Sequence, residues 1–218
     1  MPRKSLRRRR RRSSKKANKI TKSSKSKRMR GGVTVRAQDL KTRLPEDMFG
    51  EIREMHPLLT PKLTNATIRR AVRDYLNGGA RKQRVVTKYG DISNWDVSNV
   101  TTMGFIFNDA TSFNKPLNKW NVSNVTNMCS MFCGATSFNQ PLNKWNVSNV
   151  TNMNGMFYYA ESFNQQSFNQ PLNNWDVSNV RYMGGMFWGA RSFNQPLNNW
   201  NVSNVESMHN MFHFFTTF

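Results

Sequence analysis

The chain of 218 residues has few of the features that mark the common protein classes. Its two cysteines, Cys129 and Cys133, are too few for a disulfide scaffold and fit a reducing interior. No stretch approaches the run of about 18 apolar residues that a membrane span needs. The three histidines, His56, His209 and His213, do not pair with a suitable serine, cysteine or aspartate. We therefore expect no enzyme, no cofactor and no membrane span.

Acidic residues are scarce and unevenly placed. The chain has 33 Lys and Arg against 12 Asp and Glu, and residues 1–31 carry 16 basic residues and no acid. Residues 91–218, by contrast, carry 5 basic and 6 acidic residues. Because the basic charge belongs to the first third of the chain, a contact with a polyanion should be sought there.

The first 32 residues read as a disordered basic tail, because they have almost nothing apolar to bury. Such a cluster is typical of a nuclear import signal or of non-specific contact with nucleic acid, and a solvated tail that aids solubility is the third alternative. No aromatic residues are interleaved, so base stacking by the tail is not expected. No apolar segment of a secretory signal follows the arginines, and we expect an intracellular protein, in the nucleus or a virion. The candidate tail residues are Arg7, Arg8, Arg9, Arg10, Arg11, Arg12, Lys15, Lys16, Lys27, Arg28 and Arg30.

Residues 33–90 are expected to form a short helical lead-in. Thr64 or Asn65 can cap a helix that ends near Gly78-Gly79, and its apolar residues fall at i, i+3, i+4, i+7 and i+8. We expect this helix to cover the open first end of a repeat array. The apolar residues are Ile68, Ala71, Val72, Tyr75 and Leu76.

A second interpretation of this segment comes from resemblance. Leu44-Pro45-Glu46-Asp47, followed by Ile52, resembles the start of an F-box, a helical motif that recruits a ubiquitin-ligase scaffold. The resemblance implies an adaptor that uses residues 44–78 for the ligase and the repeats for its substrates.

Residues 91–218 contain five copies of one motif. The copies begin at tryptophans that are 25, 25, 30 and 25 residues apart, and copy three is longer because SFNQ is doubled in it. A period in this range indicates a stacked array, in which each unit buries its apolar face against its neighbours. We number the copies one to five by their first residues, Trp95, Trp120, Trp145, Trp175 and Trp200.

Within a copy the apolar spacing changes. Trp120 and Val122 alternate with polar residues, as in a half-buried strand. From Val125 the apolar positions fit a helical stripe through Ala135, with Ser123 or Asn124 as N-cap, and a return loop follows.

The spacing therefore predicts an α/β leucine-rich-repeat-like solenoid of five strand-helix-loop repeats of about 25 residues. A pure β-solenoid is the alternative, since so short a polar helix is weak by itself. The repeated Ser-Asn pair is expected to form side-chain ladders that satisfy main-chain groups.

The motif W-[DN]-V-S-N-V-T-N-M-x-x-M-F-x-x-A-x-S-F-N-Q-P-L-N is similar to the BspA-like, Mycoplasma-type bacterial surface-protein repeat, a domain of unknown function. The resemblance covers residues 91–218 and implies an interaction scaffold with no active site to carry over. The arginine-rich start looks more like proteins of giant double-stranded DNA viruses than like secreted bacterial members.

Departures from the repeat are the candidate functional positions. Tyr158, Tyr159 and Trp188 stand in variable columns of adjacent copies, and would form an exposed aromatic cluster for a partner if these columns face solvent. Partial packing of the three rings under a neighbouring loop is the other interpretation.

The remaining features are two pairs of possible metal ligands and the end of copy five. Cys129 and Cys133, like His209 and His213, stand at i, i+4, but copies two and five are about 15 Å apart at sheet spacing, so no shared metal site is expected. Copy five stops within its loop at Phe218, which indicates either a truncated copy or an apolar end face that associates with another molecule.

The sequence thus predicts a non-enzymatic scaffold for protein–protein interaction, with a polybasic tail for nuclear targeting or non-specific nucleic-acid contact. The F-box-like adaptor is the alternative function.

Overall fold

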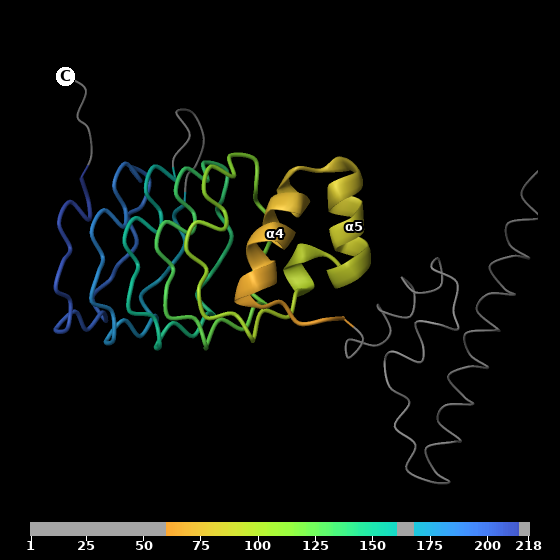
Figure 1. Ribbon diagram of the computed structural model, residues 1–218. Helices are drawn as coiled ribbons and strands as arrows, with labels where there is room; N and C mark the ends of the chain where they lie inside the picture. The colour runs from red at the N-terminus through yellow and green to blue at the C-terminus, as the bar shows by residue number, and fades with distance from the viewer. Residues whose placement is uncertain (1–59, 161–167, 214–218) are drawn as a thin grey trace, which may run out of the picture. The chain divides into compact units, whose positions relative to one another are not determined.

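The computed structural model describes residues 60–160 and 168–213. Two α-helices and a short 3-10 helix come first, and a stack of coils follows, with one turn of the stack for each copy (Figure 1).

Helix α4 spans Asn65–Leu76 and begins after Thr64, as predicted. The main-chain N–H of Thr64 donates to Oγ1 of Thr67 over 2.9 Å, which satisfies a group that the helix cannot pair itself. Four of the five predicted apolar residues are buried, whereas Leu76 is 38% exposed. The buried four are Ile68, Ala71, Val72 and Tyr75.

Helix α5, Gly79–Tyr89, was not foreseen as a second helix. Gly78 and Gly79 were predicted to end α4, but they join the two helices. Gly78 has φ +69° and reverses the chain before Gly79, where α5 begins. Val85 and Tyr89 bury one face of α5. The 3-10 helix η2, Ile92–Asn94, then leads into the first tryptophan.

The prediction of a strand and a helix in each copy is wrong. From Trp95 to His213 the described residues form no α-helix and no β-strand, and successive copies meet through isolated parallel bridges. The leucine-rich-repeat-like α/β solenoid is therefore not the fold shown by the described residues, and neither is the pure β-solenoid. The bridges are Thr102–Asn127, Asn127–Asn152, Asn152–Tyr182 and Tyr182–Ser207.

Main-chain hydrogen bonds explain the absence of the helix. The N–H groups of Met103, Phe105 and Phe107 donate to carbonyl groups of copy two, over 2.8, 2.9 and 3.0 Å. In an α-helix these groups would bond four residues back in the same segment. Because the donors point to the neighbouring copy, each copy depends on the next for its main-chain pairing.

The backbone also turns to the left-handed region at two positions in each of copies one to four, and at the first of these positions in copy five. The first column is held by Phe105 and its equivalents, with φ between 51° and 62°, and the second lies four residues later, with φ between 48° and 70°. A right-handed helix cannot pass through such residues. In these copies, the apolar spacing of three and four residues therefore corresponds to a series of tight turns and not to a helix. The first column is Phe105, Ser130, Gly155, Gly185 and Asn210, and the second is Asp109, Gly134, Tyr159 and Gly189.

Aromatic columns fill the interior of the stack. Phe107 and Phe132 stack at 5.3 Å between centroids, and Phe132 and Phe157 stack at 5.7 Å. Trp95 and Trp120 stack in the same way at 6.2 Å. Full burial of one such side chain stabilises by about 1.5–3 kcal/mol, so the columns contribute to the cohesion between copies.

The predicted Ser-Asn ladder is confirmed. The Nδ2 group of Asn124 donates to the carbonyl of Ser98 over 2.8 Å, and the equivalent amides repeat the bond to the end of the stack. Ser123, expected to cap a helix, instead donates its hydroxyl to Oδ1 of Asn121 over 2.7 Å and closes a turn.

The insertion in copy three does not disturb the core. Residues 161–167, which include most of the doubled SFNQ segment, lie outside the described residues. After them, Phe168 stacks on Phe157 at 4.0 Å and on Phe138 at 6.1 Å, as its equivalents do in other copies. The interior register is therefore the same on both sides of the insertion.

Candidate functional site

The repeated columns face the interior, and the variable columns lie at or near the surface. In the variable columns, Tyr158 is half-buried, Tyr159 is 41% exposed and Trp188 is half-buried. The Tyr158 ring lies 4.8 Å from that of Tyr159 and 5.6 Å from that of Trp188, by centroids. The structure thus brings the three predicted residues together, partly packed and partly exposed.

The backbone places these rings. Tyr159 occupies a left-handed position with φ 48°, and its N–H donates to the carbonyl of Trp188 over 2.7 Å. Gly189 lies opposite, and a Cβ there would come within 2.6 Å of Cδ1 of Tyr159. The absence of a side chain at Gly189 therefore leaves room for the Tyr159 ring.

Burial favours the neutral forms of two ionisable side chains in this region. Burial raises the pKa of Tyr158, and Tyr159 and Cys133 add to the shift. Burial also raises the pKa of the Cys133 thiol, helped by Asp109 and Cys129. Both shifts favour the neutral phenol of Tyr158 and the neutral thiol of Cys133, so Cys133 is a weak nucleophile and a weak metal ligand.

No group of three or more His, Cys, Asp or Glu that could hold a metal ion occurs within residues 60–160 and 168–213. Cys129 and Cys133 belong to copy two, whereas His209 and His213 belong to copy five. Trp188, rather than a metal ligand, contacts His213, with ring centroids 4.4 Å apart.

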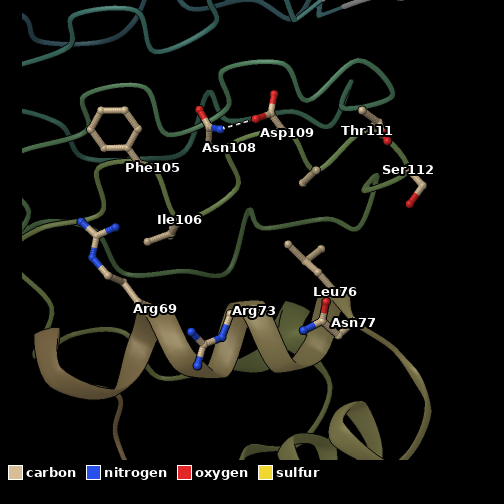
Figure 2. Close-up of a pocket in the computed structure, with 11 residues that line it drawn as sticks. Arg69, Arg73, Leu76, Asn77, Phe105, Ile106, Asn108, Asp109, Thr111 and Ser112 are labelled. Carbon is tan, nitrogen blue, oxygen red and sulfur yellow. Dashed lines mark hydrogen bonds between the residues drawn. The ribbon is translucent and has the colours of Figure 1, made fainter.

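A pocket lies between α4 and copy one, and the sequence did not predict it (Figure 2). It has a volume of about 500 Å³ and is lined by Arg69 and Arg73 on one side and Phe105 on the other. A signal was present in the sequence. In the alignment of copies, Phe105 stands where the others have serine, glycine or asparagine.

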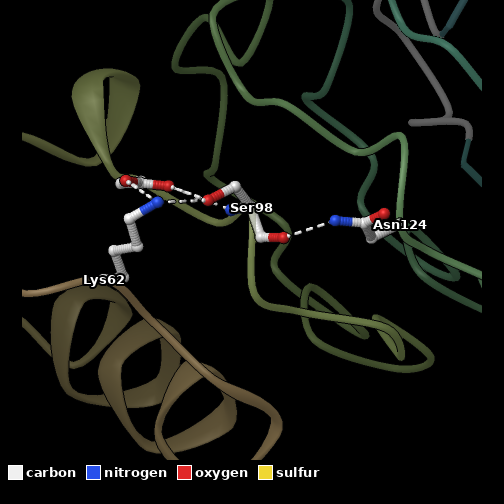
Figure 3. Close-up of polar contacts among 4 residues, drawn as sticks. Lys62, Ser98 and Asn124 are labelled. Carbon is white, nitrogen blue, oxygen red and sulfur yellow. Dashed lines mark hydrogen bonds and ion pairs between the residues drawn. The ribbon is translucent and has the colours of Figure 1, made fainter.

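Polar contacts also join the segment before α4 to copy one. Nζ of Lys62 lies 3.4 Å from Oδ2 of Asp96 and donates to Oγ of Ser98 over 3.1 Å, and the Ser98 carbonyl accepts the first bond of the asparagine ladder (Figure 3). Burial acts to raise the pKa of Asp96, but the hydrogen bonds from Ser98 and the charge of Lys62 hold it below its ordinary value. The carboxylate is thus ionised at neutral pH.

Oδ1 of Asn65 accepts from the N–H groups of Thr101 and Thr102, over 2.9 and 3.2 Å. The side chain of Asn65 therefore takes the place of a threonine carbonyl of a preceding copy, since the N–H groups of Thr126 and Thr151 donate to the carbonyls of Thr101 and Thr126 in the same way.

Several predicted positions lie outside the described residues. They include the whole basic tail and the first part of the F-box-like segment, residues 44–59. The F-box interpretation and the role of the tail therefore stay predictions. The tail residues concerned are Arg7, Arg8, Arg9, Arg10, Arg11, Arg12, Lys15, Lys16, Lys27, Arg28 and Arg30.

Neither helix of the described part of the chain is long and apolar enough to cross a membrane.

Comparison with known proteins gives one match. The sequence profile of the family described as "Mycoplasma protein of unknown function, DUF285" matches residues 80–167 and 165–218, which is the repeat region together with most of α5. No curated protein and no solved structure matches the chain.

Proposed function

We propose that this chain, which belongs to the DUF285 family of Mycoplasma proteins of unknown function, is a non-enzymatic scaffold whose repeats bind another protein. The observation that carries the proposal is the aromatic cluster of Tyr158, Tyr159 and Trp188. Interior columns repeat from copy to copy, whereas this surface differs between copies. Tyrosine and tryptophan are the side chains that most often dominate binding energy at protein interfaces.

A pair of variants tests this proposal. Tyr158→Asn with Tyr159→Asn replaces the two rings by a residue that tolerates the left-handed backbone at position 159. Tyr182→Asn is the control, since Tyr182 is 38% exposed in another column, where copies two and three have asparagine. In affinity capture with the full chain, we expect the double variant to lose a protein that the native chain and Tyr182→Asn retain. Equal retention by all three chains would contradict the proposal.

For the tail, residues 1–32, we propose nuclear targeting or non-specific contact with nucleic-acid phosphates. The support is the charge pattern, with six consecutive arginines and no acid among the first 31 residues. The same charge pattern supports a location in the nucleus or a virion and a relation to giant-virus proteins. The repeat motif supports the proposal that the chain belongs to the wider group of BspA-like repeats.

Replacement of Arg7 to Arg12 by glutamine in the full chain tests the tail. We expect weaker retention on immobilised DNA and a shallower dependence on salt, because fewer counterions are released. If the substituted chain keeps both its DNA retention and its location in cells, the tail has neither role.

We also propose that copy five associates with a second molecule of this chain. Val202, Met208 and Phe212 are 41%, 42% and 47% exposed, whereas their equivalents in copies two to four are at most 1% exposed. Among the described residues, the N–H groups of Met208 and Phe212 have no acceptor, although their equivalents in copy four donate to copy five. Because α4 already covers copy one, the end of copy five would meet the same end of the second molecule.

Sedimentation velocity over a range of concentrations tests this association. We expect a dimer that Met208→Lys converts to monomer, whereas Leu76→Lys, an exposed apolar position on α4, has no effect. A native chain that stays monomeric at all concentrations refutes the proposal.

A further inference from the structure

The pocket between α4 and copy one combines positive charge with an exposed aromatic ring. Its volume is about 500 Å³, and α4 and copy one form its two walls (Figure 2). No part of the proposed protein-binding cluster contributes to it. It is therefore a separate site on the folded part of the chain.

Arg69 and Arg73 provide the charge. They stand one turn apart on α4, both are exposed, and neither has an ion pair within the described residues. Arg70, between them in sequence, is instead 3.6 Å from Asp74. The segment 60–90 around them carries eight basic residues and one acid, so an anion is attracted to this side of the cap.

Phe105 provides the ring. It is 53% exposed and sits at φ 62°, in the column where the other copies have Ser130, Gly155, Gly185 and Asn210. A bulky residue in the left-handed region has a strained backbone. Because about half of the Phe105 side chain is exposed, its packing offsets little of the free energy of that strain. Such strain at a pocket is typical of a residue kept for binding, and not for packing.

The remaining polar groups divide the pocket into two ends. Asn108 donates to Oδ2 of Asp109 over 2.6 Å, and this carboxylate repels an anion from its end. Asn77 and Ser112 line the pocket as uncharged donors and acceptors. Figure 2 shows the two arginine side chains on the helix, and Phe105 on the coil that faces it.

We propose that this pocket binds a nucleotide unit of a single-stranded nucleic acid, with the base stacked on Phe105 and the flanking phosphates against Arg69 and Arg73. An aromatic face beside guanidinium groups is the arrangement by which proteins hold single strands without reading their sequence. The inference goes beyond the proposed function, because it places nucleic-acid contact on the folded cap and stands even if the tail binds nothing.

Photo-cross-linking of the full chain to a single-stranded hexadeoxynucleotide that carries 5-bromodeoxyuridine tests the site independently of the tail. We expect a cross-link in the tryptic peptide of residues 89–119, which contains Phe105, since trypsin does not cleave the Lys115-Pro116 bond. Phe105→Asn should reduce this cross-link at least about tenfold through the loss of stacking. Its fold should be kept, since asparagine holds the equivalent position at Asn210.

Arg69→Gln with Arg73→Gln should reduce the same cross-link and make its salt dependence shallower. Two matched controls should leave it unchanged. Tyr182→Asn removes an exposed aromatic that belongs to neither proposed site, and Arg84→Gln removes an exposed cation of α5.

Three results overturn the proposal. The first is cross-linking to residues 1–31 alone, and the second is an undiminished cross-link in Phe105→Asn when its melting temperature equals that of the native chain. The third is displacement of the oligonucleotide by a glutamate peptide of equal charge as efficiently as by an unlabelled single strand. That last result would mean that the pocket recognises anionic charge without a base.

Discussion

The indole N–H of Trp145 donates a hydrogen bond of 2.9 Å to the main-chain carbonyl of Leu117 in the preceding turn of the stack. The same bond links Trp120 to Ile92, Trp175 to Leu142 and Trp200 to Leu172. Each of these tryptophans therefore fills the core of its own copy and also donates to a carbonyl that lies three residues before the tryptophan of the preceding copy.

Trp145→Phe should lower the free energy of unfolding by about 0.5–1.5 kcal/mol, because the carbonyl of Leu117 loses one of its two donors and keeps only the main-chain N–H of Trp120. Trp200→Phe is the matched control. Its indole makes the same bond, but the side chain is only half-buried, so water can replace the lost donor. Chemical denaturation of both variants measures the difference, and equal losses would contradict the assigned role of the buried bond.

Asn149→Ala should destabilise by about 0.5–1.5 kcal/mol, because Nδ2 of Asn149 donates to the carbonyl of Ser123 over 2.7 Å. Asn149→Asp should be worse, since a carboxylate would then face a carbonyl oxygen. Asn143→Ala is the control, because Asn143 is exposed and makes no side-chain hydrogen bond within the described residues. Thermal unfolding of the three variants checks the order.

A comparison of Gly185→Ala with Gly189→Ala separates the cost of backbone strain from the cost of a clash between the new Cβ and a neighbouring side chain. Both glycines have positive φ, 61° and 70°, so alanine should cost about 1–2 kcal/mol at either position. At Gly185 the nearest atom to a new Cβ is 3.4 Å away, an ordinary contact, whereas at Gly189 the Tyr159 ring is 2.6 Å away. Gly189→Ala should therefore be the more destabilising and should also move Tyr159. Urea denaturation compares the two, and an equal effect would show that the ring moves freely.

The stability of the cap should fall at alkaline pH. Burial, the charge of Asp91 and a hydrogen bond to it raise the pKa of Tyr75 to about 12. A phenol whose pKa is higher in the folded than in the unfolded chain stabilises fully below pH 10, and that stabilisation is lost as the pH rises towards 12. The loss should be about 1–3 kcal/mol. Tyr75→Phe should abolish this part of the pH dependence of the free energy of unfolding, and an unchanged slope in Tyr75→Phe would assign it to other groups.

The sequence by itself determined the stack, the inward columns and α4. The period of 25 residues, with a tryptophan opening each copy, requires that equivalent side chains lie side by side, and Trp95 and Trp120 do so. The spacing of Ile68, Val72 and Tyr75 likewise sufficed for the buried face of α4. In each case one local pattern fits only one way of burying the apolar side chains.

Only the tertiary structure decided which main-chain groups form hydrogen bonds in each copy. Apolar residues at intervals of three and four suit both a helix and a series of turns, and the choice depends on where the N–H groups of residues such as Phe107 find acceptors. Their partners lie in the next copy, about 25 residues away, because residues such as Gly155 and Gly185 break the helix with left-handed turns. The sequence marks Phe105 as a departure from its column, but the pocket itself exists only once α4 packs against copy one and brings its two walls together.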